Sequence, residues 1–135
     1  MKDILKLFSL ALPIMVALDL SWVSVIAASF YHANLGPLLA PVPHYGAIVL
    51  FYIFYTLVLI YFALRPALIE RSLPRAMINA AVLGFGAYMT IDLTNYALIA
   101  GWPLTLAVVD IAWGIILTSL TAGLTYLVAT KIFTL

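Results

Sequence analysis

Three aspartates interrupt long apolar stretches of this chain: Asp19, Asp92 and Asp110. A carboxylate in the hydrocarbon core of a bilayer costs roughly 2.5–3.5 kcal/mol on insertion scales, so such residues mark functional positions by default. Three of them in a short chain predict one shared polar site inside a helix bundle. The alternative is structural: these groups could simply hydrogen-bond between helices, at about 0.6 kcal/mol for each pair.

Each aspartate has a hydrogen-bond donor three residues later. The pairs are Asp19 with Trp22, Asp92 with Asn95, and Asp110 with Trp113. A spacing of three residues places both side chains on one face of a helix. An indole N–H or a side-chain amide can donate to a carboxylate where water is scarce. We therefore expect these companions to stabilise the carboxylates.

Tyrosines add further donors at similar depth. Tyr88 precedes Asp92 by four residues and shares its helical face. Tyr45, Tyr52 and Tyr55 line one face of another apolar segment, and Tyr52 reaches about the depth of the third aspartate. The predicted ligand or ion pocket consists of Asp19, Trp22, Tyr52, Tyr88, Asp92, Asn95, Asp110 and Trp113.

No Lys, Arg or His lies within the apolar segments at that depth. Three ionised carboxylates would repel one another, so we expect either that some are protonated or that a cation or cationic ligand neutralises them. His32 and His44, at the expected outer helix ends, could reach the top of the pocket and, together with the aspartates, are possible ligands of a divalent metal ion. No spacing motif supports a metal site, and the sequence identifies no cofactor.

The elements that carry these residues are membrane-spanning helices. The chain has 135 residues, of which 67% are hydrophobic and only 8% charged, whereas a soluble domain has about 25% charged residues. An all-α, polytopic four-helix bundle in one domain (1–135) is predicted, because four apolar segments reach the roughly 20 residues that a crossing needs. The expected spans are about 5–30, 45–64, 76–100 and 104–129.

The basic residues predict the orientation. All six fall on one side of the four-span arrangement: Lys2, Lys6, Arg65, Arg71, Arg75 and Lys131. The positive-inside rule then places both termini and the middle connection, which is expected to hold the three arginines, in the cytoplasm. At 1.5 Å per residue, the three aspartates lie about 9–16 Å from the outer end of their helices. The pocket is thus expected in the outer half of the bilayer.

The first outer connection is expected to run from Tyr31 to His44. It is uncharged, and Pro37, Pro41 and Pro43 forbid a regular helix there. We expect it to fold over the outer end of the bundle, either as a lid or as a stiff linker.

Several function classes are excluded by missing features. The chain has no Cys, and it contains no phosphate-binding glycine loop, GxSxG, HExxH or CxxC motif. Its net charge of +1 argues against nucleic-acid binding. Membrane lipid, a second copy of the chain or a larger membrane complex are the expected partners.

The motifs together resemble a bacterial membrane-protein family labelled domain of unknown function twenty-one seventy-seven. The resemblance rests on Asp-Leu-Ser-Trp (19–22), Ala-Tyr-Met-Thr-Ile-Asp-Leu-Thr-Asn (87–95), Asp-Ile-Ala-Trp-Gly (110–114), Asn-Leu-Gly (34–36) and Phe-Tyr (51–52). It covers nearly the whole chain. The resemblance implies a four-helix inner-membrane protein and brings no activity, cofactor or catalytic residue with it.

The sequence therefore favours a small membrane protein that binds or passes a proton, a cation or a small polar ligand at the carboxylate pocket. One alternative is an enzyme or accessory factor for lipid modification at the outer leaflet, with the aspartates as acid–base or metal-binding groups. Another is a structural subunit of a larger membrane complex.

Overall fold

The computed structural model describes residues 2–133 and confirms the all-helical expectation. Residues 1, 134 and 135 of the expected domain lie outside the described residues, and residues 2–133 contain no strand. Four helical stretches are long and apolar enough to cross a membrane: Asp3–Ile26, Tyr45–Glu70, Leu73–Leu98 and Leu104–Ile132. The elements are α1 (Lys2–Ser21), the π-helix η1 (Trp22–Ile26), α2 (Ala28–Leu35), the 3-10 turn η2 (Gly36–Leu38), α3 (Tyr45–Leu59), the π-helix η3 (Ile60–Leu64), α4 (Arg65–Glu70), α5 (Leu73–Leu98) and α6 (Leu104–Ile132).

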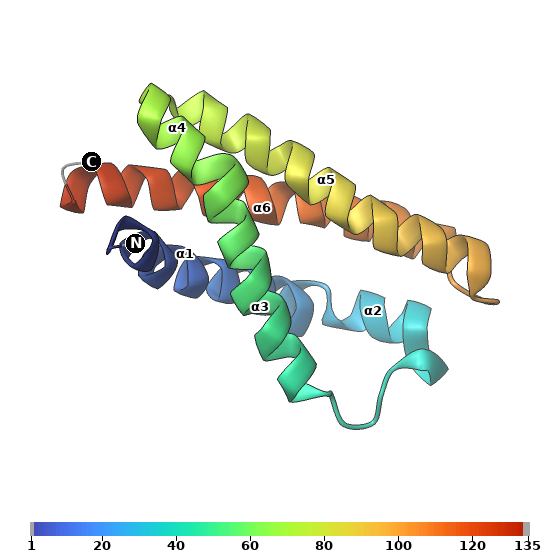
Figure 1. Cartoon of the computed structure of the whole chain (residues 1–135). Helices are drawn as coiled ribbons and strands as arrows, with labels where there is room; N and C mark the ends of the chain where they lie inside the picture. Colours follow the sequence, from blue (N-terminus) through green and yellow to red (C-terminus); the bar gives the residue numbers. More distant parts are fainter. Residues whose placement is uncertain (1, 134–135) are drawn as a thin grey trace.

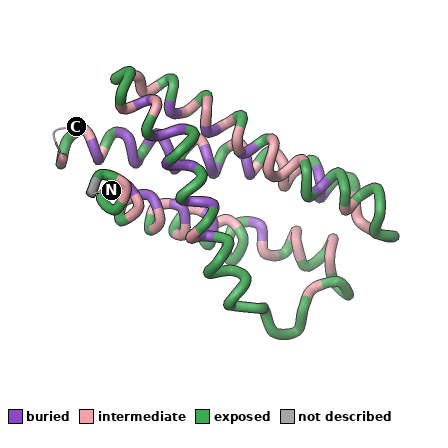
Figure 2. Tube along the Cα trace, viewed as in Figure 1, coloured by how far each residue is buried: buried purple, intermediate pink, exposed green. Residues whose placement is uncertain are grey.

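The helices form one bundle with two distinct ends. α5 packs along α6, α1 packs against α6, and α3 crosses α1 (Figure 1). The start of α1, the end of α6 and α4 gather at one end, which we call the basic end. α2 and the turn between α5 and α6 lie at the opposite end, which we call the α2 end. Buried residues recur along α1, α3, α5 and α6, whereas α2 has none (Figure 2).

α5 and α6 approach closely because glycines face each other at their contact. A Cβ on Gly84 would collide with the backbone carbonyl of Gly114, and a Cβ on Gly114 would collide with the ring of Tyr88. Small residues let membrane helices gain van der Waals contact between their backbones. This contact fixes α5 against α6, and with it the two helices that carry Asp92 and Asp110.

Short connections force the antiparallel order of the last three spans. Arg71 adopts a left-handed conformation (φ 54°) that ends α4, and Ser72 then caps α5 by accepting the backbone N–H of Arg75 at 3.2 Å. Gly101 (φ 84°) makes the turn between α5 and α6, where a positive φ favours glycine. Pro103 directly precedes α6.

The helices depart from the expected bounds in two connections. The outer connection does not begin at Tyr31: α2 continues to Leu35, and the extended segment starts after Leu38. The reason is that the first proline of this segment is Pro37, which disfavours a helix only at its own position and at the residue before it, so the helix can continue to Leu35. In the middle connection Arg65 and Arg75 lie inside α4 and α5, because the second apolar helix continues to Glu70.

Candidate functional site

Asp19 joins three helices near the centre of the bundle. The residue is 9% exposed. The phenol of Tyr52 on α3 donates to Asp19 Oδ2 at 2.6 Å, and the indole Nε1–H of Trp113 on α6 donates to Asp19 Oδ1 at 2.9 Å. Each carboxylate oxygen therefore has its own neutral donor, and such charge-assisted bonds are the stronger ones in proteins.

Asp110 is held from the α2 side. Tyr31 on α2 donates its phenol O–H to Asp110 Oδ1 at 2.7 Å, and Trp22 Nε1–H donates to the Tyr31 oxygen at 3.2 Å. Burial raises the pKa of the Tyr31 phenol well above its usual value, because the phenolate would lose its hydration there. Tyr31 therefore stays a neutral donor to the carboxylate at any physiological pH.

A π-helical turn brings Tyr31 into this position. Tyr31 follows Trp22 by nine residues, or 2.5 turns of a regular α-helix, which would place the two side chains on opposite faces. Instead η1 widens the helix at Trp22, whose carbonyl accepts the N–H of Ala27 at 2.7 Å, and the chain bends at Ala27 (φ −108°, ψ 10°). π-Turns of this kind are frequent at functional sites.

The two tryptophans connect the two carboxylates. The rings of Trp22 and Trp113 stack with centroids 4.7 Å apart and an interplanar angle of 11°. A continuous chain of polar and aromatic contacts thus runs from Tyr52 through Asp19, Trp113, Trp22 and Tyr31 to the carboxylate of Asp110.

Asp92 is the exception in the site. It is 1% exposed, and neither of its carboxylate oxygens has a hydrogen-bond partner in the described part of the chain. Its neighbour is the carboxyl of Asp110 across the α5–α6 contact. A buried polar atom without a partner costs about 1–3 kcal/mol, and more when the group is charged. Asp92 and Asp110 therefore form a carboxyl pair in which one member has no donor of its own.

Tyr88 and Asn95, also expected in the pocket, and the neighbouring Tyr45 and Tyr55 make no hydrogen bond to the three aspartates in the described part of the chain. The Tyr88 ring packs on Gly114, and Asn95 is half-buried beyond Asp92 on α5. Tyr45 is 65% exposed and stands apart from the site. Tyr55, which shares the face of Tyr52, exchanges a hydrogen bond of 2.8 Å with the hydroxyl of Thr118.

The donors pair differently from the i,i+3 expectation. Trp113 donates a hydrogen bond to Asp19 on another helix. Trp22 donates to Tyr31, which in turn donates to Asp110. The side chains at positions i and i+3 project from the helix in nearly the same direction. Their polar ends therefore bond to groups on the facing helix and not to each other. Sequence reasoning also missed Tyr31, because it was assigned to the outer connection and the π-turn that redirects it has no clear signature.

No basic side chain of residues 3–133 forms a salt bridge with Asp19, Asp92 or Asp110. The chain has no Lys or Arg between Lys6 and Arg65, or between Arg75 and Lys131. Among the side chains of residues 3–133 the only salt bridge joins Glu70 and Arg75, at the basic end (3.7 Å). His32 and His44 are exposed, and the described residues contain no group of three or more His, Asp or Glu side chains placed to hold a metal ion.

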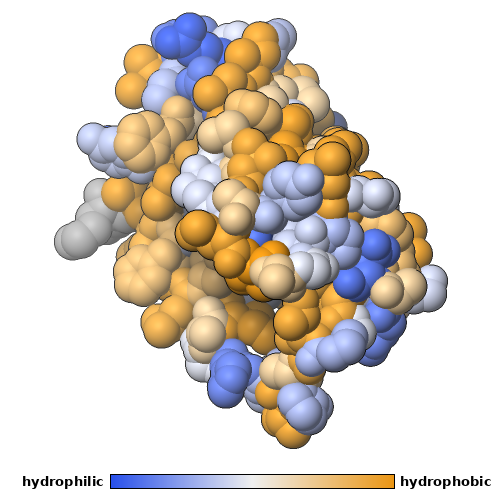
Figure 3. All heavy atoms as spheres, turned by 90° about the vertical axis from the view of Figure 1, so that its right-hand side faces the viewer, coloured by the Kyte–Doolittle hydropathy of each residue, from blue (hydrophilic) through white to orange (hydrophobic). Residues whose placement is uncertain are grey.

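Polar groups interrupt the apolar surface at the α2 end. Figure 3 shows this face, where hydrophilic patches lie among hydrophobic side chains. Exposed side chains that can exchange hydrogen bonds with water at this end include those of His32, His44, Thr94 and Thr105. Asp110 is half-buried whereas Asp92 is fully buried, so Asp110 is the more exposed member of the carboxyl pair.

Comparison with known proteins identifies the family. No curated protein and no solved structure matches the chain at a significant level. The family model described as "Predicted membrane protein (DUF2177)" matches residues 4–127, a stretch that contains all three aspartates and Tyr31. The chain therefore belongs to the DUF2177 family of predicted membrane proteins.

Proposed function

We propose that this membrane protein binds and exchanges a proton at the Asp92–Asp110 pair, on the outer side of a bacterial inner membrane, with both termini in the cytoplasm. The observation that carries the proposal is Asp92: two buried carboxylate oxygens, no donor from the described chain, and a second carboxyl as neighbour. Two carboxyls in this situation cannot both be ionised without a large cost, and a single shared proton removes it.

The three aspartates have different roles in this proposal. Asp19 has a donor for each oxygen, so it acts as a fixed structural acceptor. Asp110 has one donor, Tyr31, which leaves its second oxygen for Asp92 or a proton. Exchange then proceeds through half-buried Asp110 toward the α2 end.

The ligand set favours a proton over a divalent ion. Ca²⁺ takes six to eight oxygen ligands, and Mg²⁺ demands an octahedral set. The Asp92–Asp110 pair offers two carboxylates, and Tyr31 already occupies one of the four oxygens. A proton needs only the two carboxyls, so the geometry suits it without further groups.

A proton-release measurement tests the proposal. The purified protein is taken through an alkaline pH jump with an indicator dye, and the released protons are counted for wild type, Asp92→Asn and Glu70→Gln. Glu70 is an exposed carboxyl at the basic end and serves as the control. We expect Asp92→Asn to release one proton fewer than wild type in the range above the usual carboxyl pKa of about 4. Equal proton counts in wild type and Asp92→Asn would overturn the proposal.

A labelling experiment tests the orientation. The chain has no Cys, so single cysteines are unambiguous. Ala40→Cys lies in the exposed extended segment at the α2 end, and Glu70→Cys lies at the basic end. In whole cells a membrane-impermeant maleimide should label Ala40→Cys at once, and Glu70→Cys after permeabilisation only. The reverse order would place the carboxyl pair on the cytoplasmic side.

A further inference from the structure

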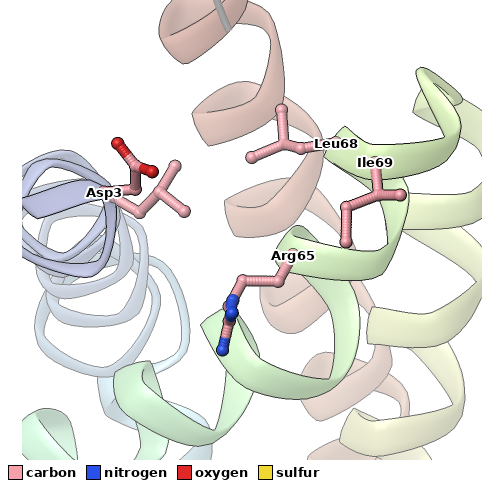
Figure 4. A pocket seen from close by; sticks show the side chains of 5 residues that line it. Asp3, Arg65, Leu68 and Ile69 are labelled. Atoms are coloured by element: carbon pink, nitrogen blue, oxygen red, sulfur yellow. The ribbon is translucent and has the colours of Figure 1, made fainter. Parts of the chain in front are cut away.

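A second polar feature lies at the basic end, away from the carboxyl pair. A cavity of about 260 Å³ opens between the start of α1 and α4, and it is lined by Asp3, Leu7, Arg65, Leu68 and Ile69. Figure 4 shows Asp3 on one side of this cavity and Arg65 on the other. Neither makes a salt bridge with any side chain of residues 3–133. An acidic and a basic group thus face one space without neutralising each other.

Arg65 also lines a second, apolar groove. The groove has a volume of about 340 Å³ and lies between α1, α3, η3 and the start of α4; its lining residues are Ile4, Phe54, Leu57, Val58, Ile60, Tyr61, Phe62 and Arg65. Apart from the Tyr61 hydroxyl and Arg65, the side chains of this set are hydrocarbon. Arg65 therefore lines both the cavity that contains the two opposite charges and the apolar groove, which is suited to hydrocarbon.

The depth of the two charged groups matches the lipid headgroup region. Asp3 is the first residue of the first candidate span, and Arg65 is five residues before the end of the second, which is about 8 Å along a helix. The flanking Tyr61 is of the residue type enriched at membrane–water interfaces. A headgroup would reach Asp3 and Arg65 while its acyl chain stays at hydrocarbon depth.

We propose that this site binds one zwitterionic phospholipid with a primary ammonium group. The phosphate diester lies against the Arg65 guanidinium, whose planar set of donors matches phosphate oxygens. The ammonium donates to the Asp3 carboxylate across the cavity, and one acyl chain occupies the apolar groove. The alternative for Arg65 alone is that it merely extends its charged end to the interface, but that alternative does not involve Asp3 and predicts no headgroup preference.

Native mass spectrometry of the whole protein in mild detergent tests the site. The probes are phosphatidylethanolamine, phosphatidylglycerol and phosphatidylcholine with identical acyl chains, and inorganic phosphate alone. The variants are Arg65→Gln and Asp3→Asn. Arg71→Gln is the matched control, because Arg71 is an exposed arginine at the same end that lines neither cavity. Circular dichroism establishes that each variant is folded.

The lipid pattern separates the outcomes. Wild type should retain phosphatidylethanolamine more tightly than the other two lipids. Arg65→Gln should weaken phosphatidylethanolamine and phosphatidylglycerol alike, by about tenfold, since both lose the phosphate contact. Asp3→Asn should weaken phosphatidylethanolamine alone, and Arg71→Gln should match wild type. Equal binding of all three lipids by wild type, equal losses in Arg65→Gln and Arg71→Gln, or inorganic phosphate binding as tightly as the lipid would each overturn the proposal.

Discussion

The indole of Trp22 stacks on that of Trp113, with ring centroids 4.7 Å apart, and the two N–H groups serve different carboxylates. Trp113 donates to Asp19, and Trp22 donates to Tyr31, which in turn donates to Asp110. An aromatic pair of this kind contributes about 0.5–1.5 kcal/mol beyond the area it buries. The stack therefore acts as a rigid spacer that sets the separation of two carboxylates on different helices.

Replacing Trp113 by Phe should destabilise the bundle through the lost donor. Asp19 Oδ1 would have no partner, which should lower the free energy of unfolding in detergent by about 1–3 kcal/mol. Trp102→Phe is the control, because the buried indole N–H of Trp102 has no partner in the described residues. Equal losses in the two variants, measured by denaturant titration, would show that the Trp113–Asp19 bond contributes nothing.

The two most buried aspartates should respond oppositely to neutralisation. In Asp19→Asn one acceptor oxygen becomes an NH₂ group, so Tyr52 or Trp113 faces a donor and stability should fall by about 1–3 kcal/mol. In Asp92→Asn no donor is displaced, and the new amide can donate to Asp110, so unfolding should need the same or more free energy. Both variants can be compared in one thermal or denaturant series. A larger loss for Asp92→Asn would mean that Asp92 has a structural partner.

Adding a methyl group to Gly84 should disrupt the α5–α6 contact. The new Cβ meets the Gly114 backbone, which cannot rotate away, and overpacking of this kind costs typically about 1–3 kcal/mol. Gly86 lies on the same helix and has open space around the Cβ position, so Gly86→Ala should be neutral or stabilising by up to about 1 kcal/mol. The heat-induced loss of helical circular dichroism checks both. Similar melting of the two variants would contradict the close contact.

The four-helix fold could be predicted from the sequence, but the hydrogen-bond partners within the site could not. Apolar length predicted four helices, and the aspartates with their donors predicted a shared polar region, because both depend on composition and helical periodicity. The exchange of partners between Trp22 and Trp113 depends on how helices face one another, which periodicity within one helix does not contain. Tyr31 was missed for a related reason: one π-turn and the bend at Ala27 rotate it by about half a turn relative to a regular helix.

Alkaline titration should find Tyr31 among the last tyrosines to ionise. Its pKa is raised mainly by burial, so the neutral phenol is favoured in the folded state. The stability that this group provides is present below the usual tyrosine pKa of about 10 and is lost as pH rises further toward the folded-state value. The phenolate absorbance that wild type has and Tyr31→Phe lacks should develop above about pH 10. If this difference in absorbance developed below about pH 10, Tyr31 would not be buried beside Asp110.

The infrared band of protonated carboxyl groups tests the shared proton most directly. Spectra of the reconstituted protein are recorded at neutral pH for wild type, Asp92→Asn and Asp19→Asn. We predict that wild type shows a protonated-carboxyl C=O band, that Asp92→Asn loses it, and that folded Asp19→Asn keeps it. Absence of the band in wild type at neutral pH, or its survival in Asp92→Asn, would contradict a proton held between Asp92 and Asp110.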